Sequence, residues 1–265
     1  MCSSDLVWGG GIMAGWGVMD FAGGIVVHAT AGTAALVCAV MVGKRRHFLQ
    51  SQIPPHSPAL TMIGASMLWV GWFGFNGGSA LGAGGGAGMA LLVTHIAAAT
   101  ASLVWMGIEW MRFGRPSLVG IVTGMVAGLA TVTPASGFIG VPGGLILGLA
   151  GGFGCYIAVD IIRGKLKIDD SLDVFGIHGV GGIAGALLTG VFAAPGLGGT
   201  GAADFSIGSQ LLVQAEGVVI TMVWSSLVAF IAYKIVDWTI GLRVSEEDER
   251  EGLDISSHGE SAYNR

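Results

Sequence analysis

The sequence predicts an all-α, polytopic membrane protein with seven transmembrane helices. Of its 265 residues, 52% are hydrophobic and only 11% are charged, whereas soluble domains carry about 25% charged residues. The mean hydropathy is +0.74. The 48 glycines follow no collagen period and are interleaved with Leu, Ile, Val and Ala, a pattern typical of closely packed membrane helices.

Each expected span is a stretch of about 20 apolar residues, the length that crosses a bilayer as a helix. The fourth stretch is short, and the last is long and polar at both ends, so we expect the last helix to extend beyond the membrane. These spans form a membrane domain over residues 1–243, and a tail follows at 244–265. The expected spans lie at about 21–43, 59–81, 89–108, 117–133, 143–162, 174–194 and 211–241.

The basic residues assign a side of the membrane to each loop. All 12 Lys and Arg residues lie at or after the ends of the first, third, fifth and seventh expected spans. Because cytoplasmic loops are enriched in Lys and Arg, we expect the N-terminus outside and the C-terminus inside the cytoplasmic (inner) membrane. The residues concerned are Lys44, Arg45, Arg46, Arg112, Arg115, Arg163, Lys165, Lys167, Lys234, Arg243, Arg250 and Arg265.

Charge and cysteine content exclude several classes of function. The net charge is −5 and no basic stripe is present, so nucleic-acid binding is not expected. Cys2, Cys38 and Cys155 lie in separate segments and form neither a disulfide framework nor a zinc-binding spacing. We expect no metal, no cofactor and no enzymatic activity. The acidic tail is compatible with a solvated, partly disordered terminus.

Two histidines lie inside expected spans and share a sequence frame. Ala-Thr-Ala-Gly-Thr-Ala-Ala follows His28, and Gly-Val-Gly-Gly-Ile-Ala-Gly follows His178. Ionisable residues within the membrane are costly and mark functional sites, and matching frames indicate an internal repeat that brings both to one site. The alternative is two buried histidines bonded to helix carbonyls. Two neutral rings that share a hydrogen bond would leave outer nitrogens facing a lumen suited to a small polar molecule.

Acidic residues stand at the start of both histidine spans. Asp20 suits a helix N-cap, which interacts favourably with the positive end of the helix, and a carboxylate near a pore mouth would also favour cations. Asp173 is expected to cap the sixth span in the same way. His95 also lies in an apolar run, but its flanking residues share only part of the frame, so we interpret it as a structural residue.

An aromatic segment precedes the end of the second span. Trp72 and Phe75 are three residues apart and Ser79 is one turn further, so the three share a helix face. Aromatic rings beside a hydroxyl can bind a small cation, and Trp8 would complete such an outer vestibule. The alternative is that these aromatic residues anchor the helix at the membrane interface.

These segments together resemble the ammonium transporter family (Amt/Mep, with the Rh proteins as relatives). The resemblance extends from about Leu6 to Tyr263, and the tail, with Glu249 to Asp254 and His258 to Glu260, resembles that of bacterial members. The long motifs, in order, are Asp20-Phe-Ala-Gly-Gly-Ile-Val-Val-His28, Gly71-Trp-Phe-Gly-Phe-Asn-Gly-Gly-Ser79, Thr133-Pro-Ala-Ser-Gly and Asp173-Val-Phe-Gly-Ile-His178-Gly-Val.

The resemblance implies a fold of eleven helices, formed by two inverted five-helix halves and a long last helix. It also implies a homotrimer in which every subunit has its own pore, embedded in membrane lipid. The seven spans here look like the last seven, and we expect the first four to be absent. A PII-type signal protein is the implied partner at the cytoplasmic face. The implied cargo is ammonium, which passes as ammonia.

The resemblance also implies roles for single residues. His28 and His178 are the paired pore histidines. Trp8 and Ser79 belong to the outer ammonium recruitment site, with Asp20 below it. The gate and the pore lining are implied at Phe75, Trp72, Val126 and Val174. Three alternatives stay open, namely a non-conducting ammonium sensor, an inactive truncated fragment and an electron-transfer protein with histidine-ligated haem.

Overall fold

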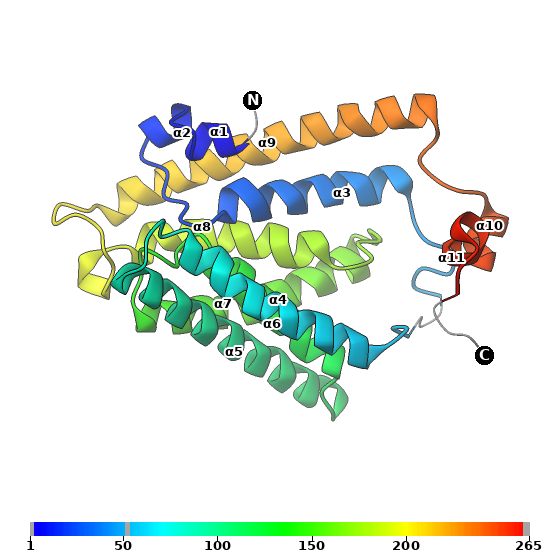
Figure 1. Ribbon diagram of the computed structural model, residues 1–265, viewed down its shortest axis with the longest axis horizontal. Coiled ribbons are helices and arrows are strands. Elements are labelled where there is room, and N and C mark those ends of the chain that lie inside the picture. Colours follow the sequence, from blue (N-terminus) through cyan, green and yellow to red (C-terminus); the bar gives the residue numbers. More distant parts are fainter. Residues whose placement is uncertain (1–2, 51–53, 262–265) are drawn as a thin grey trace.

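The computed structural model describes residues 3–50 and 54–261. Within these ranges every regular element is a helix (Figure 1), which confirms the predicted all-α class. Cys2 and the last residues of the tail, Arg265 among them, lie outside the described residues.

Six of the described helical stretches are long and apolar enough to cross a membrane, and a seventh, α6, is apolar but shorter. The two histidine stretches each begin with a π-helical turn that continues into an α-helix. The stretches are η1 (Gly24–Ala29) with α3 (Thr30–Val42), α4 (Pro58–Gly78), α5 (Gly85–Phe113), α6 (Leu118–Val132), α7 (Val141–Asp160) with η2 (Ile161–Lys165), η3 (Phe175–Gly179) with α8 (Val180–Phe192), and α9 (Ile207–Thr239). Helix α5 is longer at both ends than the apolar stretch expected at 89–108.

Serine side chains cap the N-termini of three of the apolar helices. The hydroxyls of Ser57, Ser117 and Ser206 accept hydrogen bonds from backbone N–H groups in the first turns of α4, α6 and α9. These N–H groups have no partner within their own helix, and a serine at the N-cap supplies one. The helix boundaries therefore follow from local side-chain chemistry as well as from hydropathy.

Glycine lets the central helices approach closely. A Cβ on Gly124 or Gly128 of α6 would collide with the backbone of α5, and a Cβ on Gly148 of α7 would collide with the same helix. Helices α5, α6 and α7 thus pack backbone to backbone, as small residues allow in membranes. Helix α4 is far less enclosed, since only 6% of its apolar window is buried.

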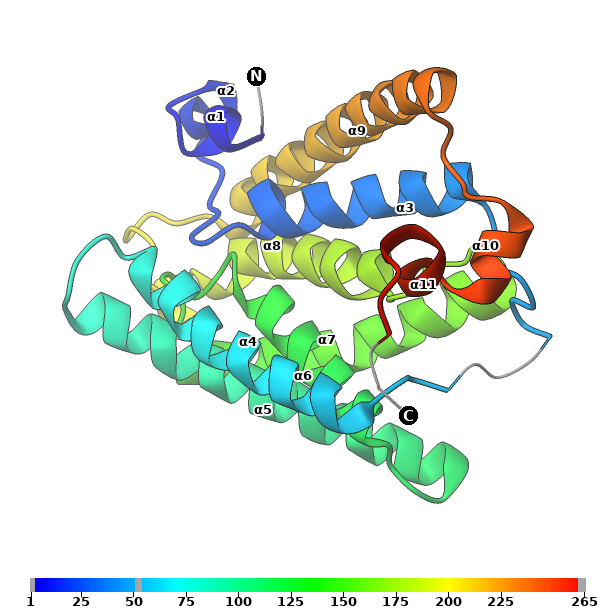
Figure 2. The ribbon, with the colours of Figure 1, turned by 45° about the vertical axis from the view of Figure 1, so that its right-hand side comes forward.

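The short helices gather at the two opposite ends of the bundle (Figures 1 and 2). Helices α1 (Ser3–Val7) and α2 (Ile12–Gly15) lie at one end, and α10 (Glu246–Glu251) and α11 (Leu253–His258) lie at the other. A 3-10 turn, η4 (Pro195–Leu197), lies in the loop before α9. Helix α9 runs along the edge of the bundle beside α3.

The tail is tied to the loop that follows α3. The guanidinium of Arg243 makes an ion pair with Glu249 at 2.7 Å and donates to the carbonyl oxygen of Lys44 at 2.7 Å. The backbone N–H of Arg46 also donates to Glu249. These hydrogen bonds, with that from Arg243 the strongest, hold the pKa of Glu249 below its usual value. The described part of the tail is therefore ordered by specific contacts.

Candidate functional site

The two histidines with matching frames meet in the middle of the bundle. Nδ1 of His28 lies 3.2 Å from Nδ1 of His178, and their ring centroids are 5.2 Å apart. A hydrogen bond between these nitrogens requires that one ring carries the proton at Nδ1 and the other does not. The side chain of His28 is almost fully buried. Both residues lie on π-helical turns, which are rare and frequently found at functional sites.

Glycines bring the two histidine helices within reach of each other. A Cβ on Gly32 would collide with the backbone of Gly179, the residue directly after His178. A Cβ on Gly182 would likewise collide with the Gly24 carbonyl and with Cβ of His28. The contact between the rings therefore depends on glycines in both helices.

A carboxylate caps the start of each histidine helix. Asp20 accepts hydrogen bonds from the backbone N–H groups of Gly23, Gly24, Ile25 and Val26 at 2.6–3.0 Å, so the capping prediction for Asp20 is confirmed. Asp170 accepts from Val174, Phe175 and Gly176. Asp170 is thus the counterpart of Asp20 in the second repeat, and the prediction that Asp173 fills this role is wrong.

Geometry explains why the cap is Asp170 rather than Asp173. Asp173 has a positive φ of 54°, and its carboxylate lies 3.4 Å from the guanidinium of Arg163, away from the helix start. Asp20 and Asp170 each precede their histidine by eight residues. Extending the comparison of the two frames backwards to this shared position would have identified Asp170 from the sequence.

The position of Asp173 leads to a prediction about pH. Burial raises the pKa of Asp173 from 3.8 to about 6, although Arg163 lowers it. The folded state then binds this proton more tightly than the unfolded state, so the contribution of Asp173 to stability decreases as the pH rises from about 4 to about 6. Asp173→Asn removes the titration, and the unfolding temperature of the variant should rise relative to that of the wild type across this range.

Thermal unfolding in detergent at a series of pH values checks this expectation. Asp204→Asn, in an exposed loop before α9, serves as the matched control and should follow the wild type. A constant difference between Asp173→Asn and the wild type over the whole range would contradict the assignment.

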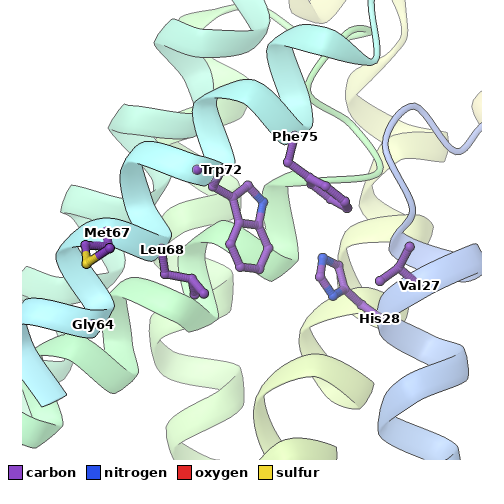
Figure 3. Close-up of a pocket in the computed structure, with 8 residues that line it drawn as sticks. Val27, His28, Gly64, Met67, Leu68, Trp72 and Phe75 are labelled. Carbon is purple, nitrogen blue, oxygen red and sulfur yellow. The ribbon is translucent and has the colours of Figure 1, made fainter.

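Two aromatic rings of α4 lie against the histidine pair. The indole of Trp72 stacks with the His28 ring at 5.3 Å and 18°, and it is nearly parallel to the His178 ring, at 6.4 Å and 11°. The ring of Phe75 lies 6.2 Å from that of His28. Trp72 and Phe75, predicted to share a helix face, both point across to His28 (Figure 3).

An apolar groove of about 630 Å³ opens between α4 and the first histidine helix. Among the described residues, Nε2 of His28 is buried and has no hydrogen-bond partner. An unpaired ring nitrogen beside apolar walls can bind one small polar molecule and offers an ion little compensation for its lost hydration. The lining residues are Val27, His28, Gly64, Met67, Leu68, Gly71, Trp72 and Phe75 (Figure 3).

The predicted vestibule residues lie apart from the histidine pair. The indole of Trp8 is half-exposed, and its N–H donates to the carbonyl oxygen of Asp20 at 2.8 Å. The hydroxyl of Ser79 donates to the Phe75 carbonyl one turn back in the same helix. The structure thus links Trp8 to the Asp20 cap, and it turns the Ser79 hydroxyl towards its own helix.

The remaining predicted residues lie near the pair or at the surface. Val126 packs beside both Trp72 and Trp105. The backbone of Val174 donates to the Asp170 cap. His95 is exposed at the side of α5 and stacks on Trp69 at 5.2 Å, so it is not part of the site.

Sequence reasoning missed Gln214. Its buried side chain accepts from the N–H of Met19 at 2.7 Å and donates to the carbonyl oxygens of Met19, at 2.7 Å, and Ala186, at 2.9 Å. It therefore connects α9 to the loop that carries Asp20 and to the helix that follows His178. No periodic signal surrounds a single glutamine, because its role depends on contacts that are distant in sequence.

Membrane-length helices around a largely buried histidine pair and an apolar groove define a multi-pass membrane protein. Residues 1–263 match the model of the Ammonium Transporter Family. The chain belongs to this family, as the resemblance of its motifs predicted.

Individual relatives support this assignment. The chain is 48% identical over 258 residues to an ammonium transporter of Aquifex aeolicus, covering 97% of this chain and 60% of that protein. It is 49% identical to ammonium transporter Amt1 of Archaeoglobus fulgidus, covering 97% of this chain and 65% of that protein. The chain thus spans less than two thirds of the length of these curated relatives.

Solved structures show the same fold. A sensor Amt protein superposes with a TM-score of 0.86 at 32% identity, over 93% of this chain and 62% of that one. Mep2 of Saccharomyces cerevisiae superposes with a TM-score of 0.80 at 36% identity, over 88% of this chain and 56% of that one. Both similarities extend over nearly all of this chain.

Proposed function

We propose that the protein moves ammonium across the cytoplasmic membrane, in the form of ammonia, along the groove beside His28 and His178. The observation that supports this most is the direct bond between the two rings, with the outer nitrogen of His28, at an apolar groove, unpaired within the described part of the chain. The relatives named ammonium transporters support the choice of cargo.

The physical basis is the cost of moving charge into an apolar lumen. An ion without partners in a low-dielectric medium costs tens of kcal/mol, whereas a neutral polar molecule costs only about 2–7 kcal/mol. Ammonium can lose its proton and potassium cannot. An apolar groove therefore admits ammonia and rejects potassium, and an imidazole nitrogen offsets part of the remaining cost by a hydrogen bond.

We assign the other residues to stages of the same passage. Trp8 and Ser79 would capture the cation at the outer end, with Asp20 below them, and this requires the Ser79 hydroxyl to turn away from Phe75. Further along the path, the gate and the pore lining would be formed by Phe75, Trp72, Val126 and Val174.

The same proposal includes assembly and orientation. The N-terminus lies outside and the C-terminus in the cytoplasm, as the distribution of Lys and Arg indicates. The membrane domain would comprise residues 1–243 and the cytoplasmic tail residues 244–265. The functional unit would be a homotrimer in lipid, and a PII-type signal protein would bind at the face where α10 and α11 lie.

A second candidate is a sensor that binds ammonium without conducting it, since one structural neighbour is named a sensor Amt protein. An inactive fragment is a third, because the groove is open along α4. An electron-transfer protein with histidine-ligated haem is disfavoured, since the two rings bond directly to each other.

Uptake into proteoliposomes that contain the purified chain tests the proposal. Ammonium uptake well above that of empty liposomes, with no uptake of potassium, is the expected result. Binding measured by calorimetry without uptake would favour the sensor. Absence of both uptake and binding would contradict transport by this chain.

A further inference from the structure

The segment Thr133–Gly137, with the sequence Thr-Pro-Ala-Ser-Gly, follows α6 and has no role in the passage described above. Thr133, Ala135 and Ser136 are completely buried. The hydroxyl of Ser136 donates to the carbonyl oxygen of Thr133, so the turn is held by its own side chain. A buried turn with these contacts is a candidate for positioning the elements around it.

The turn contacts both histidine helices. A Cβ on Gly24, at the start of the His28 helix, would collide with the ring of Pro134. A Cβ on Gly185, two turns beyond His178, would collide with Pro134 as well. The carbonyl oxygen of Pro134 also accepts a hydrogen bond from the N–H of Phe21 at 3.0 Å. Pro134 thus lies wedged between the two repeats.

The first residue of the turn, Thr133, contacts Trp72 of α4, the helix that lines the other side of the groove. The indole N–H of Trp72 donates to the Thr133 hydroxyl at 2.9 Å, and this bond is buried. The same hydroxyl donates its single proton to the Leu129 carbonyl at 2.6 Å. Its lone pair is therefore the acceptor, and the indole N–H, which can only donate, has a defined direction.

This bond restricts the plane of the indole. Trp72 is 8% exposed, and rotating its ring out of the observed plane would leave a buried N–H and a hydroxyl lone pair without partners, which is costly. In the observed orientation the indole lies within 18° of the His28 ring and 11° of the His178 ring. The hydroxyl of Thr133 therefore favours the orientation in which the indole is nearly parallel to each histidine ring, whose own planes are 29° apart.

We propose that Thr133 is a positioning residue that acts through Trp72, holding the indole parallel to the histidine pair and so setting the shape of the conducting groove. The proposal rests on the proposed function for its effect on transport, whereas the orientation of the indole can be measured independently. Thr133 acts on the passage only through the ring that it orients.

Two pairs of variants test this role. Thr133→Val keeps the shape of the side chain and removes the acceptor, and Thr133→Ser restores the hydroxyl. Uptake of ammonium into proteoliposomes should fall about tenfold for Thr133→Val, the effect of losing one buried hydrogen bond, and should stay near the wild type for Thr133→Ser. In a Trp72→Phe background, which has no indole N–H, Thr133→Val should cause no further loss. If Thr133→Val does not fold, Thr133→Ala is used in its place, and its uptake is compared with that of Thr133→Ser.

Nuclear magnetic resonance of the indole ¹⁵N–¹H group provides the second measurement. The Trp72 signal is assigned among the eight tryptophans as the one missing in Trp72→Phe. It should shift upfield in Thr133→Val and stay in place in Thr133→Ser. An unchanged signal, or an effect of Thr133→Val that adds fully to that of Trp72→Phe, would overturn the proposal. If the wild type shows no uptake, the proposed function fails, and this signal alone decides the positioning role.

Discussion

Replacing both His28 and His178 with alanine is expected to reduce ammonium uptake roughly ten- to hundredfold, which corresponds to the 1–3 kcal/mol cost of leaving a polar group unpaired in an apolar site. The variant should still insert into the membrane, because most of the apolar surface of both helices is retained. Because a wider lumen lets an ion keep more of its hydration, discrimination between ammonium and potassium should also weaken.

Uptake and competition by potassium in proteoliposomes measure this result. The matched control is His95→Ala, since His95 lies exposed on a membrane helix away from the pair and its replacement should leave uptake unchanged. Ammonium uptake and selectivity equal to those of the wild type in the double variant would contradict the assigned role of the pair.

Gly32→Ala is expected to destabilise the fold by roughly 1–3 kcal/mol, the cost of overpacking a close contact. The added methyl group would collide with the backbone of Gly179, and a backbone cannot move aside as a side chain end can. The two histidine helices must then separate, so the bond between the rings should weaken and uptake should fall as well.

Thermal unfolding and uptake of the same preparation check this expectation. Gly107→Ala is the matched control, because Gly107 lies inside α5 and a Cβ there would meet no atom of residues 3–50 or 54–261 within 4 Å. The control should unfold at or above the wild-type temperature, since alanine is the better helix former. A Gly32→Ala protein as stable as the control would contradict the expectation, because it would show that the helices tolerate a wider separation.

The helical class was predictable because it depends on local properties of the chain. A segment in the membrane must satisfy its own backbone hydrogen bonds, so length and hydropathy are sufficient to predict the helices. The matching frames of His28 and His178 predicted that the two would meet, and the structure places their nitrogens 3.2 Å apart. The spacing of Trp72 and Phe75 predicted their common face for the same local reason.

The vestibule was less predictable. The sequence placed Trp8 and Ser79 near the same end of the bundle, but the direction of each side chain depends on its competing partners. Trp8 bonds to the backbone of Asp20, and Ser79 bonds to its own helix. A hydroxyl in a helix can always reach a carbonyl one turn back, and spacing alone does not show whether it does so.

By itself, the sequence indicated the family through the resemblance of its motifs, the helical segments through composition and apolar length, and the paired histidines through a repeated frame. Only the tertiary structure decided that Asp173 pairs with Arg163 instead of capping the second histidine helix, that Gln214 connects three segments and that Thr133 accepts the bond from Trp72. Each of these contacts joins groups by direction and distance, and hydropathy, which reports only whether a segment is buried, contains no information on direction.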